Sequence, residues 1–169
     1  MYPTIKPGEH FWVERVNGDH FAYSPKRLDI VVFSASPGWD YAPGSGQLLK
    51  RVIGLPGDTV VCCDRSTGEL VVNGVASPEP FLAPRAGVPG SAVPPALCDG
   101  PEAFAGSPTA CSSGWKVTVP AGMLFVMGDN RSNSVDSAFH MCASDDPEQS
   151  KCAPTVFVPV GDVDGVVVR

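Results

Sequence analysis

Residues 48–58, with the sequence LLKRVIGLPGD, place Lys50 inside an apolar, strand-like run that ends in a turn. Lysine is disfavoured in the interior of a strand. Its side chain is either an exposed cation, as most lysines are, or an amine held among apolar neighbours, where desolvation lowers its pKa toward neutrality. In the second case the neutral amine is available as a base, and the rest of the sequence has to decide between the two.

Length and composition limit the fold class. The chain of 169 residues is long enough for one compact domain or for a core with a substantial insertion. Its 18 prolines and 18 glycines interrupt any long helical pattern, whereas short valine-rich runs are frequent. We therefore predict an all-β fold of mainly antiparallel sheets with a loop-rich insertion. The formal net charge of −6 argues against a nucleic-acid partner, because a phosphate backbone attracts a basic face.

The cysteines indicate an oxidising compartment. They are Cys62, Cys63, Cys98, Cys111, Cys142 and Cys152. Their even number and wide spacing favour disulfides over a zinc site, with Cys142 and Cys152 as one local pair; reduced, partly buried thiols are the alternative. We also find no basic-then-apolar leader and no apolar run near the ~20 residues of a membrane span. We therefore expect a fragment whose upstream portion carries the targeting information.

Several apolar runs around the Lys50 stretch predict strands. They occupy residues 11–16, 30–33, 59–63, 115–119 and 123–127, with further valine-rich strands after residue 155. Asn73-Gly74, between two β-forming runs, predicts a hairpin. Trp39 and Tyr41 lie in a loop rich in Pro and Gly, where they either pack locally or face a membrane.

The same pattern divides the chain into two parts. We predict a β-rich core made of residues 1–61 and 115–169. Residues 62–114 interrupt it with a hairpin and a Pro- and Gly-rich segment that is pinned by disulfides.

The polar stretch at residues 128–137, GDNRSNSVDS, directly follows the apolar run at 123–127. A cluster of Asp, Asn, Arg and Ser at the end of a core strand is a place where a functional site can be built. A hydrogen-bonded turn without chemistry is the alternative.

Three separated segments together resemble the type I signal peptidases, membrane-anchored serine proteases that remove leader peptides from exported proteins. Residues 1–5 (MYPTI) are similar to the family's Ser-Met-x-Pro-Thr-Leu segment, and residues 50–58 (KRVIGLPGD) to its lysine box. Residues 128–137 are similar to its Gly-Asp-Asn-Arg-x-x-Ser-x-Asp-Ser box, and residues 27–33 add a weaker match. The cysteine-rich insertion resembles the actinobacterial branch of the family.

The resemblance implies a Ser-Lys protease with Lys50 as the general base and Ser134 as the residue that orients its amine. The residues that it implies as a scaffold are Arg51, Asp129, Arg131 and Asp136. We expect an ion pair between Arg51 and Asp129 that holds the polar box against the Lys50 strand. The resemblance implies neither a cofactor nor a metal ion.

The resemblance also implies the substrate and the cellular location. Leader peptides end in the small residues of an Ala-x-Ala pattern. Positions that line the first substrate pocket are matched by Met1, Ile5, Leu48 and Leu49, for which ordinary core packing is the alternative. An extended substrate is expected to add as a strand beside Lys50. The implied partners are signal peptides and, through a missing upstream anchor, the extracytoplasmic face of the bacterial cell membrane.

Two departures from the family pattern stand out. The nucleophilic serine would stand immediately before Met1, so the chain as numbered is expected to be inactive. Ala138 stands where the family usually has an arginine after its Asp-Ser pair, which leaves a salt bridge to Asp136 in doubt. His140 is the only histidine near the proposed site and is not required as a base.

Two other classes of protein remain as alternatives. A non-catalytic extracytoplasmic β-module that binds exported peptides would explain the missing serine without a truncation. A self-cleaving Ser-Lys protease of the repressor type is the nearer rival, but the six cysteines argue against a cytosolic regulator.

Overall fold

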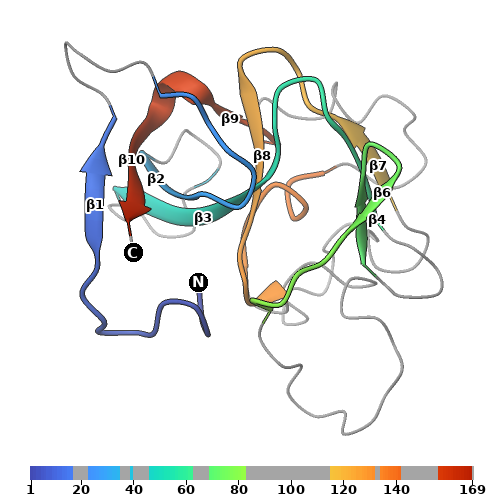
Figure 1. The fold of residues 1–169 in the computed structure, drawn as a ribbon. Coiled ribbons are helices and arrows are strands. Elements are labelled where there is room, and N and C mark those ends of the chain that lie inside the picture. Colours follow the sequence, from blue (N-terminus) through green and yellow to red (C-terminus); the bar gives the residue numbers. More distant parts are fainter. Residues whose placement is uncertain are drawn as a thin grey trace, which may run out of the picture.

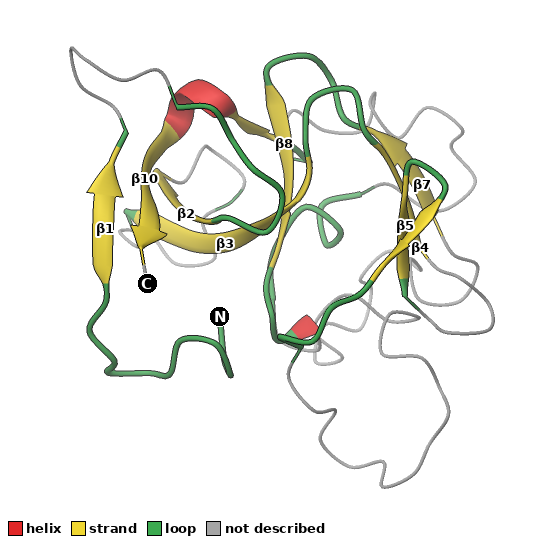
Figure 2. Cartoon of the chain, in the orientation of Figure 1, coloured by secondary structure: helices red, strands yellow, loops and turns green. Residues whose placement is uncertain are grey.

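The computed structural model describes residues 1–16, 23–34, 39, 46–62, 69–82, 115–131, 134–141 and 156–168. Within these residues the chain forms two antiparallel sheets, and its only helical elements are short 3₁₀ turns (Figures 1 and 2). The predicted all-β class is confirmed.

The larger sheet has six strands in the order β1-β10-β2-β3-β8-β9. These strands are β1 (Trp12–Arg15), β2 (Ile30–Ser34), β3 (Gln47–Gly54), β8 (Met123–Met127), β9 (Val158–Pro159) and β10 (Val163–Val168). A 3₁₀ turn, η4 (Val160–Asp162), connects β9 to β10. The Lys50 strand, β3, lies between β2 and β8, so the stretch that opened the sequence analysis is central to this sheet.

The smaller sheet has four strands in the order β6-β5-β4-β7. They are β4 (Thr59–Cys62), β5 (Leu70–Val72), β6 (Val75–Ser77) and β7 (Trp115–Thr118). The turn between β5 and β6 has positive φ at both central residues, 53° at Asn73 and 80° at Gly74, as a type I′ turn requires. The predicted hairpin is therefore confirmed, and its β5 strand pairs directly with β4.

Strands β3 and β8 form a wall that both hydrophobic cores share. Leu124 and Val126 pack with Val52 in the core beneath the larger sheet, whereas Phe125 and Met127 pack in the core beside the smaller one. Successive residues of a strand point to opposite faces. A strand that is buried on both faces therefore needs an unbroken apolar run, which is what residues 123–127 supply.

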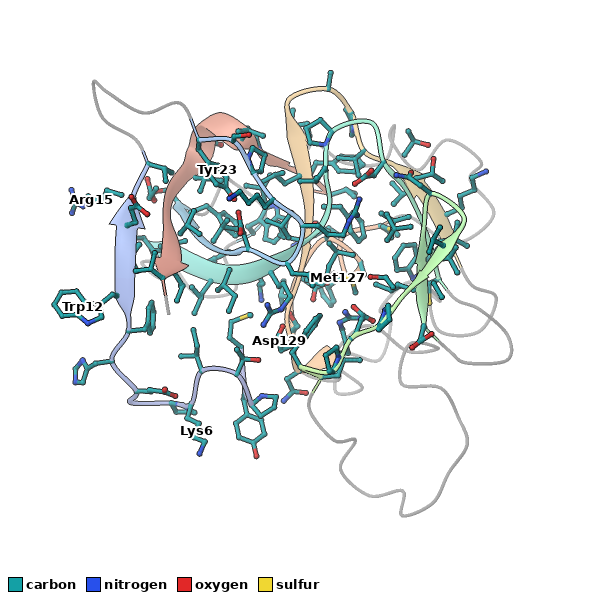
Figure 3. The ribbon with its side chains drawn as sticks, in the orientation of Figure 1. Lys6, Trp12, Arg15, Tyr23, Met127 and Asp129 are labelled. Carbon is teal, nitrogen blue, oxygen red and sulfur yellow. The ribbon has the colours of Figure 1, made fainter. Side chains whose placement is uncertain are left out.

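Trp39 belongs to the core rather than to an exposed loop. Its side chain is 2% exposed and meets the ring of Phe33 edge-on at 5.4 Å between centroids. Trp39 therefore packs, as one of the two alternatives expected, but it packs against the core and not only within its loop. A membrane-facing role does not fit a side chain that is buried. Tyr41 lies outside the described residues. Among the described large hydrophobic side chains the most exposed is Trp12 on edge strand β1, which points away from the sheet in Figure 3.

One of the six cysteines falls within the described residues. Cys62 ends β4, is buried and is disulfide-bonded. The other cysteines lie outside the described residues, so the pairing of Cys142 with Cys152 stays a prediction.

Gly54 marks the point where the Lys50 strand passes from one core to the other. The register between β3 and β8 shifts between Val52 and Gly54. A Cβ atom on Gly54 would lie 2.8 Å from Val119 Cγ2 and 2.9 Å from Val60 Cγ2. Both contacts are closer than van der Waals packing allows, so only glycine lets β3 approach the smaller sheet this closely.

We expect Gly54→Ala to lower the free energy of unfolding by about 1–3 kcal/mol, because the added methyl group overpacks this junction. Urea denaturation monitored by tryptophan fluorescence measures the change. The matched control is Gly161→Ala, because a Cβ at Gly161 meets no atom within 4 Å. Equal stabilities of the two variants would contradict the steric explanation.

Candidate active site

Lys50 lies on β3 opposite Val31 of β2, and its amine reaches the polar box that follows β8. Its Nζ donates a hydrogen bond of 3.0 Å to the hydroxyl oxygen of Ser134. Burial lowers the pKa of Lys50 below its ordinary value, and the negative charge of Asp136 opposes this shift only in part. Of the two interpretations of Lys50, the structure therefore supports the amine held in apolar surroundings.

The position of Ser134 depends on Gly128, the first residue after β8. Ser134 is buried at 6% exposure. A Cβ atom on Gly128 would lie 2.3 Å from Ser134 Oγ and 2.8 Å from its Cβ. The backbone of Gly128 is thus the surface against which Ser134 rests, and no larger residue leaves room for it.

Asp136 shapes the polar box through backbone hydrogen bonds. One carboxylate oxygen accepts the N–H of Gly128 at 3.0 Å, and the other accepts the N–H of Ala138 at 3.1 Å. Asp136 is 2% exposed, and these backbone N–H groups supply the hydrogen bonds that its buried carboxylate needs. This explains how the box closes with alanine at position 138, where the family usually has an arginine.

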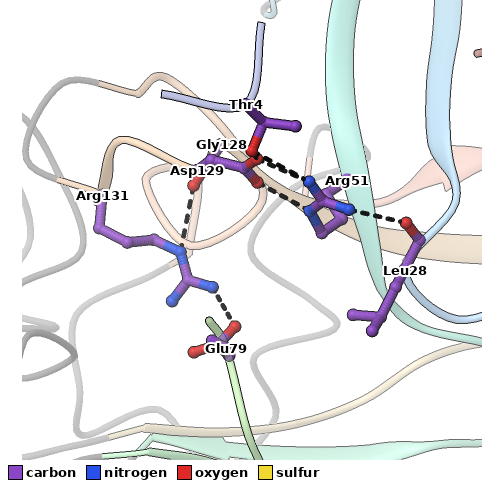
Figure 4. A network of polar contacts seen from close by, with 7 residues as sticks. All are labelled: Thr4, Leu28, Arg51, Glu79, Gly128, Asp129 and Arg131. Atoms are coloured by element: carbon purple, nitrogen blue, oxygen red, sulfur yellow. Dashed lines mark hydrogen bonds and ion pairs between the residues drawn. The ribbon is translucent and has the colours of Figure 1, made fainter. Parts of the chain in front are cut away.

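Arg51 and Asp129 form the ion pair that the sequence analysis predicted. Arg51 Nε and Nη2 donate to the two carboxylate oxygens of Asp129 at 2.8 and 2.7 Å, a bidentate geometry in which both residues are buried. Arg51 Nη1 also donates to the carbonyl oxygen of Leu28 at 2.9 Å, and the Thr4 hydroxyl donates to Asp129 (Figure 4). The pair thereby joins β3, the polar box, the N-terminal segment and the segment before β2.

Arg131 holds the same box from another direction. Its Nε donates to the carbonyl oxygen of Gly128 at 3.1 Å, and its Nη2 forms an ion pair with Glu79 (Figure 4). Two residues further on, the ring of Phe81 lies 4.0 Å from Cζ of Arg51. Sequence reasoning missed Glu79 and Phe81, because they lie in the segment for which we predicted little regular structure. The sequence offered one weak indication of their role: an acidic and an aromatic residue that belong to no predicted strand.

The predicted pocket residues divide into two groups. The N-terminal segment that carries Met1 and Ile5 reaches the site through Thr4, whose hydroxyl donates a hydrogen bond to Asp129. Ile5 is buried and closes a turn by donating its N–H to the Met1 carbonyl oxygen at 3.0 Å. Leu48 shares the face of Lys50 and packs against the core beneath the larger sheet, whereas Leu49 points to the opposite face.

His140 lies near this site but contacts aromatic rings. Its ring centroid is 4.8 Å from that of Trp39 and 5.3 Å from that of Phe139. Burial lowers the pKa of His140, so the imidazole is held in its neutral form at neutral pH. The amine with a lowered pKa that contacts Ser134 is that of Lys50.

A family model described as signal peptidase, peptidase S26, matches residues 1–168. The chain belongs to this family. Probable signal peptidase I of Mycobacterium leprae is 31% identical over 196 residues, covering 98% of this chain and 63% of that protein. Signal peptidase I of Bacillus caldolyticus is 36% identical over 138 residues, covering 81% of this chain and 63% of that protein.

A crystal structure of a signal peptidase I from Enterococcus faecalis has the same fold. It is 28% identical with a TM-score of 0.53, and the match covers 86% of this chain and 98% of that one. The chain spans somewhat less than two thirds of the length of the curated relatives that it matches. Among the described residues, no helix has the length and apolar character needed to cross a membrane.

The buried amine predicts a pH dependence of stability that Lys50→Met should remove. Between the lowered pKa of Lys50 in the fold and its ordinary value of 10.5, the unfolded state binds the extra proton, so the free energy of unfolding rises with pH. At lower pH the variant should be more stable than the parent chain, because methionine has no ammonium charge that folding must desolvate. Urea denaturation across this pH range measures both effects. Lys116→Met, at an exposed lysine on β7, is the control that should keep the slope; a slope that survives in Lys50→Met would contradict the assignment.

Gly128→Ala should displace Ser134 and break its hydrogen bond to Lys50, because the new methyl group would occupy the place of the hydroxyl. We expect the free energy of unfolding to fall by about 1–3 kcal/mol from overpacking. A crystal structure of the variant shows the displacement, and denaturation gives the energy. An intact contact between Lys50 and Ser134 in that structure would contradict the prediction.

Proposed function

We propose that this chain carries the catalytic domain of a type I signal peptidase, a serine endopeptidase that removes signal peptides from exported preproteins after small residues. The observation that carries the proposal is the 3.0 Å hydrogen bond between the partly buried amine of Lys50 and Ser134. A lysine with a lowered pKa beside an orienting hydroxyl is suited to act as a general base. Membership of the signal peptidase family and the names of the relatives support the same activity.

The proposed nucleophile is a serine encoded immediately before Met1. Its Oγ attacks the scissile carbonyl carbon while its proton passes to the neutral Nζ of Lys50. Collapse of the tetrahedral intermediate breaks the C–N bond, and the Lys50 ammonium returns the proton to the leaving amine. Water then hydrolyses the acyl-enzyme with Lys50 again acting as base. Support comes from Thr4, whose hydroxyl donates to Asp129 and so holds the N-terminal segment at the box that carries Ser134.

The geometry of β3 supports binding of the substrate as an added strand. Between Gln47 and Lys50 the strand pairs with β2 on one side, and β8 begins to pair with β3 only at Arg51. Within the described residues, the second edge of this part of β3 is therefore available to an extended peptide. Met1, Ile5, Leu48 and Leu49 are proposed to form the pocket for the small residue before the cut.

We further propose that an anchor upstream of Met1 holds the domain at the extracytoplasmic face of the membrane. The disulfide at Cys62 supports an oxidising compartment. The proposed substrates are the signal peptides of exported preproteins, whose cleavage sites lie at the same membrane surface.

The test uses the full-length protein, with the residues encoded before Met1, and a reporter peptide with an Ala-x-Ala cleavage site. We expect Lys50→Met to lower kcat/KM by about 10²- to 10⁴-fold, the usual contribution of a general base. Lys116→Met should cleave like the parent protein, because this exposed lysine lies on β7 of the smaller sheet. Retained cleavage by Lys50→Met would show that the base is misassigned. A residue other than serine before Met1 would sink the proposed nucleophile.

A further inference from the structure

We infer that residues 78–82, which follow β6 and are called the strap below, position the polar box at residues 128–137. Through Phe81 and Glu79 the strap holds the two arginines that fix Gly128 and Asp129, and it thereby sets the place of Ser134 beside Lys50. The inference rests on the proposed function, since it names further positioning residues for the same reaction.

The first arm of the strap is Phe81. Its ring covers the guanidinium of Arg51, with 4.0 Å between Cζ and the ring centroid. A guanidinium offers its flat face to an aromatic ring while its N–H groups point outward in its own plane. Arg51 uses that plane for the bidentate pair with Asp129 and for the carbonyl oxygen of Leu28. The ring therefore restrains the arginine without competing for any of these hydrogen bonds.

The second arm is Glu79. It forms the ion pair with Arg131, and the two side chains are only 3% and 4% exposed. Arg131 in turn donates from Nε to the carbonyl oxygen of Gly128 at 3.1 Å (Figure 4). Removing one partner of a buried ion pair leaves the other charge desolvated and uncompensated. Glu79 thus fixes Arg131, and through it the backbone of Gly128.

Both arms converge on two consecutive residues, Gly128 and Asp129. Arg51 holds the carboxylate of Asp129, and Arg131 holds the carbonyl of Gly128. Gly128 touches Ser134 so closely that not even a Cβ atom would fit between them. A shift of Gly128 therefore moves Ser134, whose hydroxyl is 3.0 Å from Lys50 Nζ.

The strap also links the active site to the smaller sheet. It follows β6, and β6 pairs with β5 across the type I′ turn at Asn73-Gly74. The strap is thus held by a hairpin whose own residues take no part in the chemistry. This connection gives the smaller sheet a role in the geometry of a site that lies on the larger one.

The experiment measures cleavage of the Ala-x-Ala reporter by full-length Phe81→Leu, Phe81→Tyr, Glu79→Gln and the double variant Phe81→Leu/Glu79→Gln. Kinetic constants are referred to the concentration of folded enzyme from near-UV circular dichroism. Phe81→Leu and Glu79→Gln should each lower kcat by about ten- to a hundredfold, because a misplacement of about 1 Å has that effect. KM should change less than kcat, since the contacts of Phe81 and Glu79 that carry the inference are to Arg51 and Arg131, which fix the place of Ser134. Phe81→Tyr keeps the ring and should retain most of kcat.

Two further readouts separate positioning from a general loss of structure. A displaced Ser134 admits water to Lys50, so the acid limb of the pH profile of kcat/KM should move to higher pH in Phe81→Leu. Because the two arms hold neighbouring residues, Asp129 and Gly128, and both act through Ser134, their effects are coupled. The double variant should therefore lose less activity than the product of the two single losses. Val75→Ala, at a side chain 70% exposed in the same hairpin, is the control that should match the parent protein.

The outcomes distinguish failure of this inference from failure of the proposed function. The inference is overturned if Phe81→Leu and Glu79→Gln keep the parent kcat, if the acid limb stays in place, or if the losses multiply. It is likewise overturned if the lost activity matches a smaller folded fraction. Cleavage by Lys50→Met would instead reject the proposed base, whatever the strap variants show.

Discussion

The buried ion pair between Arg51 and Asp129 connects four separate parts of the chain. Its two charge-assisted hydrogen bonds hold β3 to the box after β8. The remaining groups of the pair reach Thr4 in the N-terminal segment and Leu28 before β2. A buried pair gives little net stability, because desolvation offsets much of the Coulomb attraction. Its effect here is geometric, since four segments must meet in one arrangement for both charges to be satisfied.

Lys50 and Arg51 are neighbours on one strand, but their side chains lie in different surroundings. Their side chains point to opposite faces of the sheet. Arg51 is surrounded by acceptors and an aromatic ring, which suits the planar fork of N–H donors of a guanidinium. Lys50 has burial and one hydroxyl partner, so its pKa is lowered and its amine can lose a proton. A single strand thus carries a permanent cation that organises the box and a titratable amine beside it.

The shared wall of β3 and β8 explains why the site lies where it does. Both strands are buried on two faces where they meet, with one hydrophobic core on either side. The polar box begins at Gly128, the first residue beyond β8, and returns to that strand through Ser137, which bonds to the backbone of Val126 in both directions. Ser134 is therefore carried on a loop whose two ends are fixed to the buried strand β8, as a site with a narrow tolerance in distance requires.

The sequence by itself determined the strand content, the hairpin at Asn73-Gly74 and the segments that meet at the site. These follow from local patterns: apolar runs, a turn dipeptide, a lysine inside one apolar run and a polar box at the end of another. The pair between Arg51 and Asp129 followed from the family motifs, which fix which residues stand together. Only the tertiary structure decided that Trp39 is in the core, that Gly128 supports Ser134, and that Glu79 and Phe81 cover the two arginines. These contacts join segments far apart in the chain, and a residue's local sequence carries no information about which distant surface will bury it.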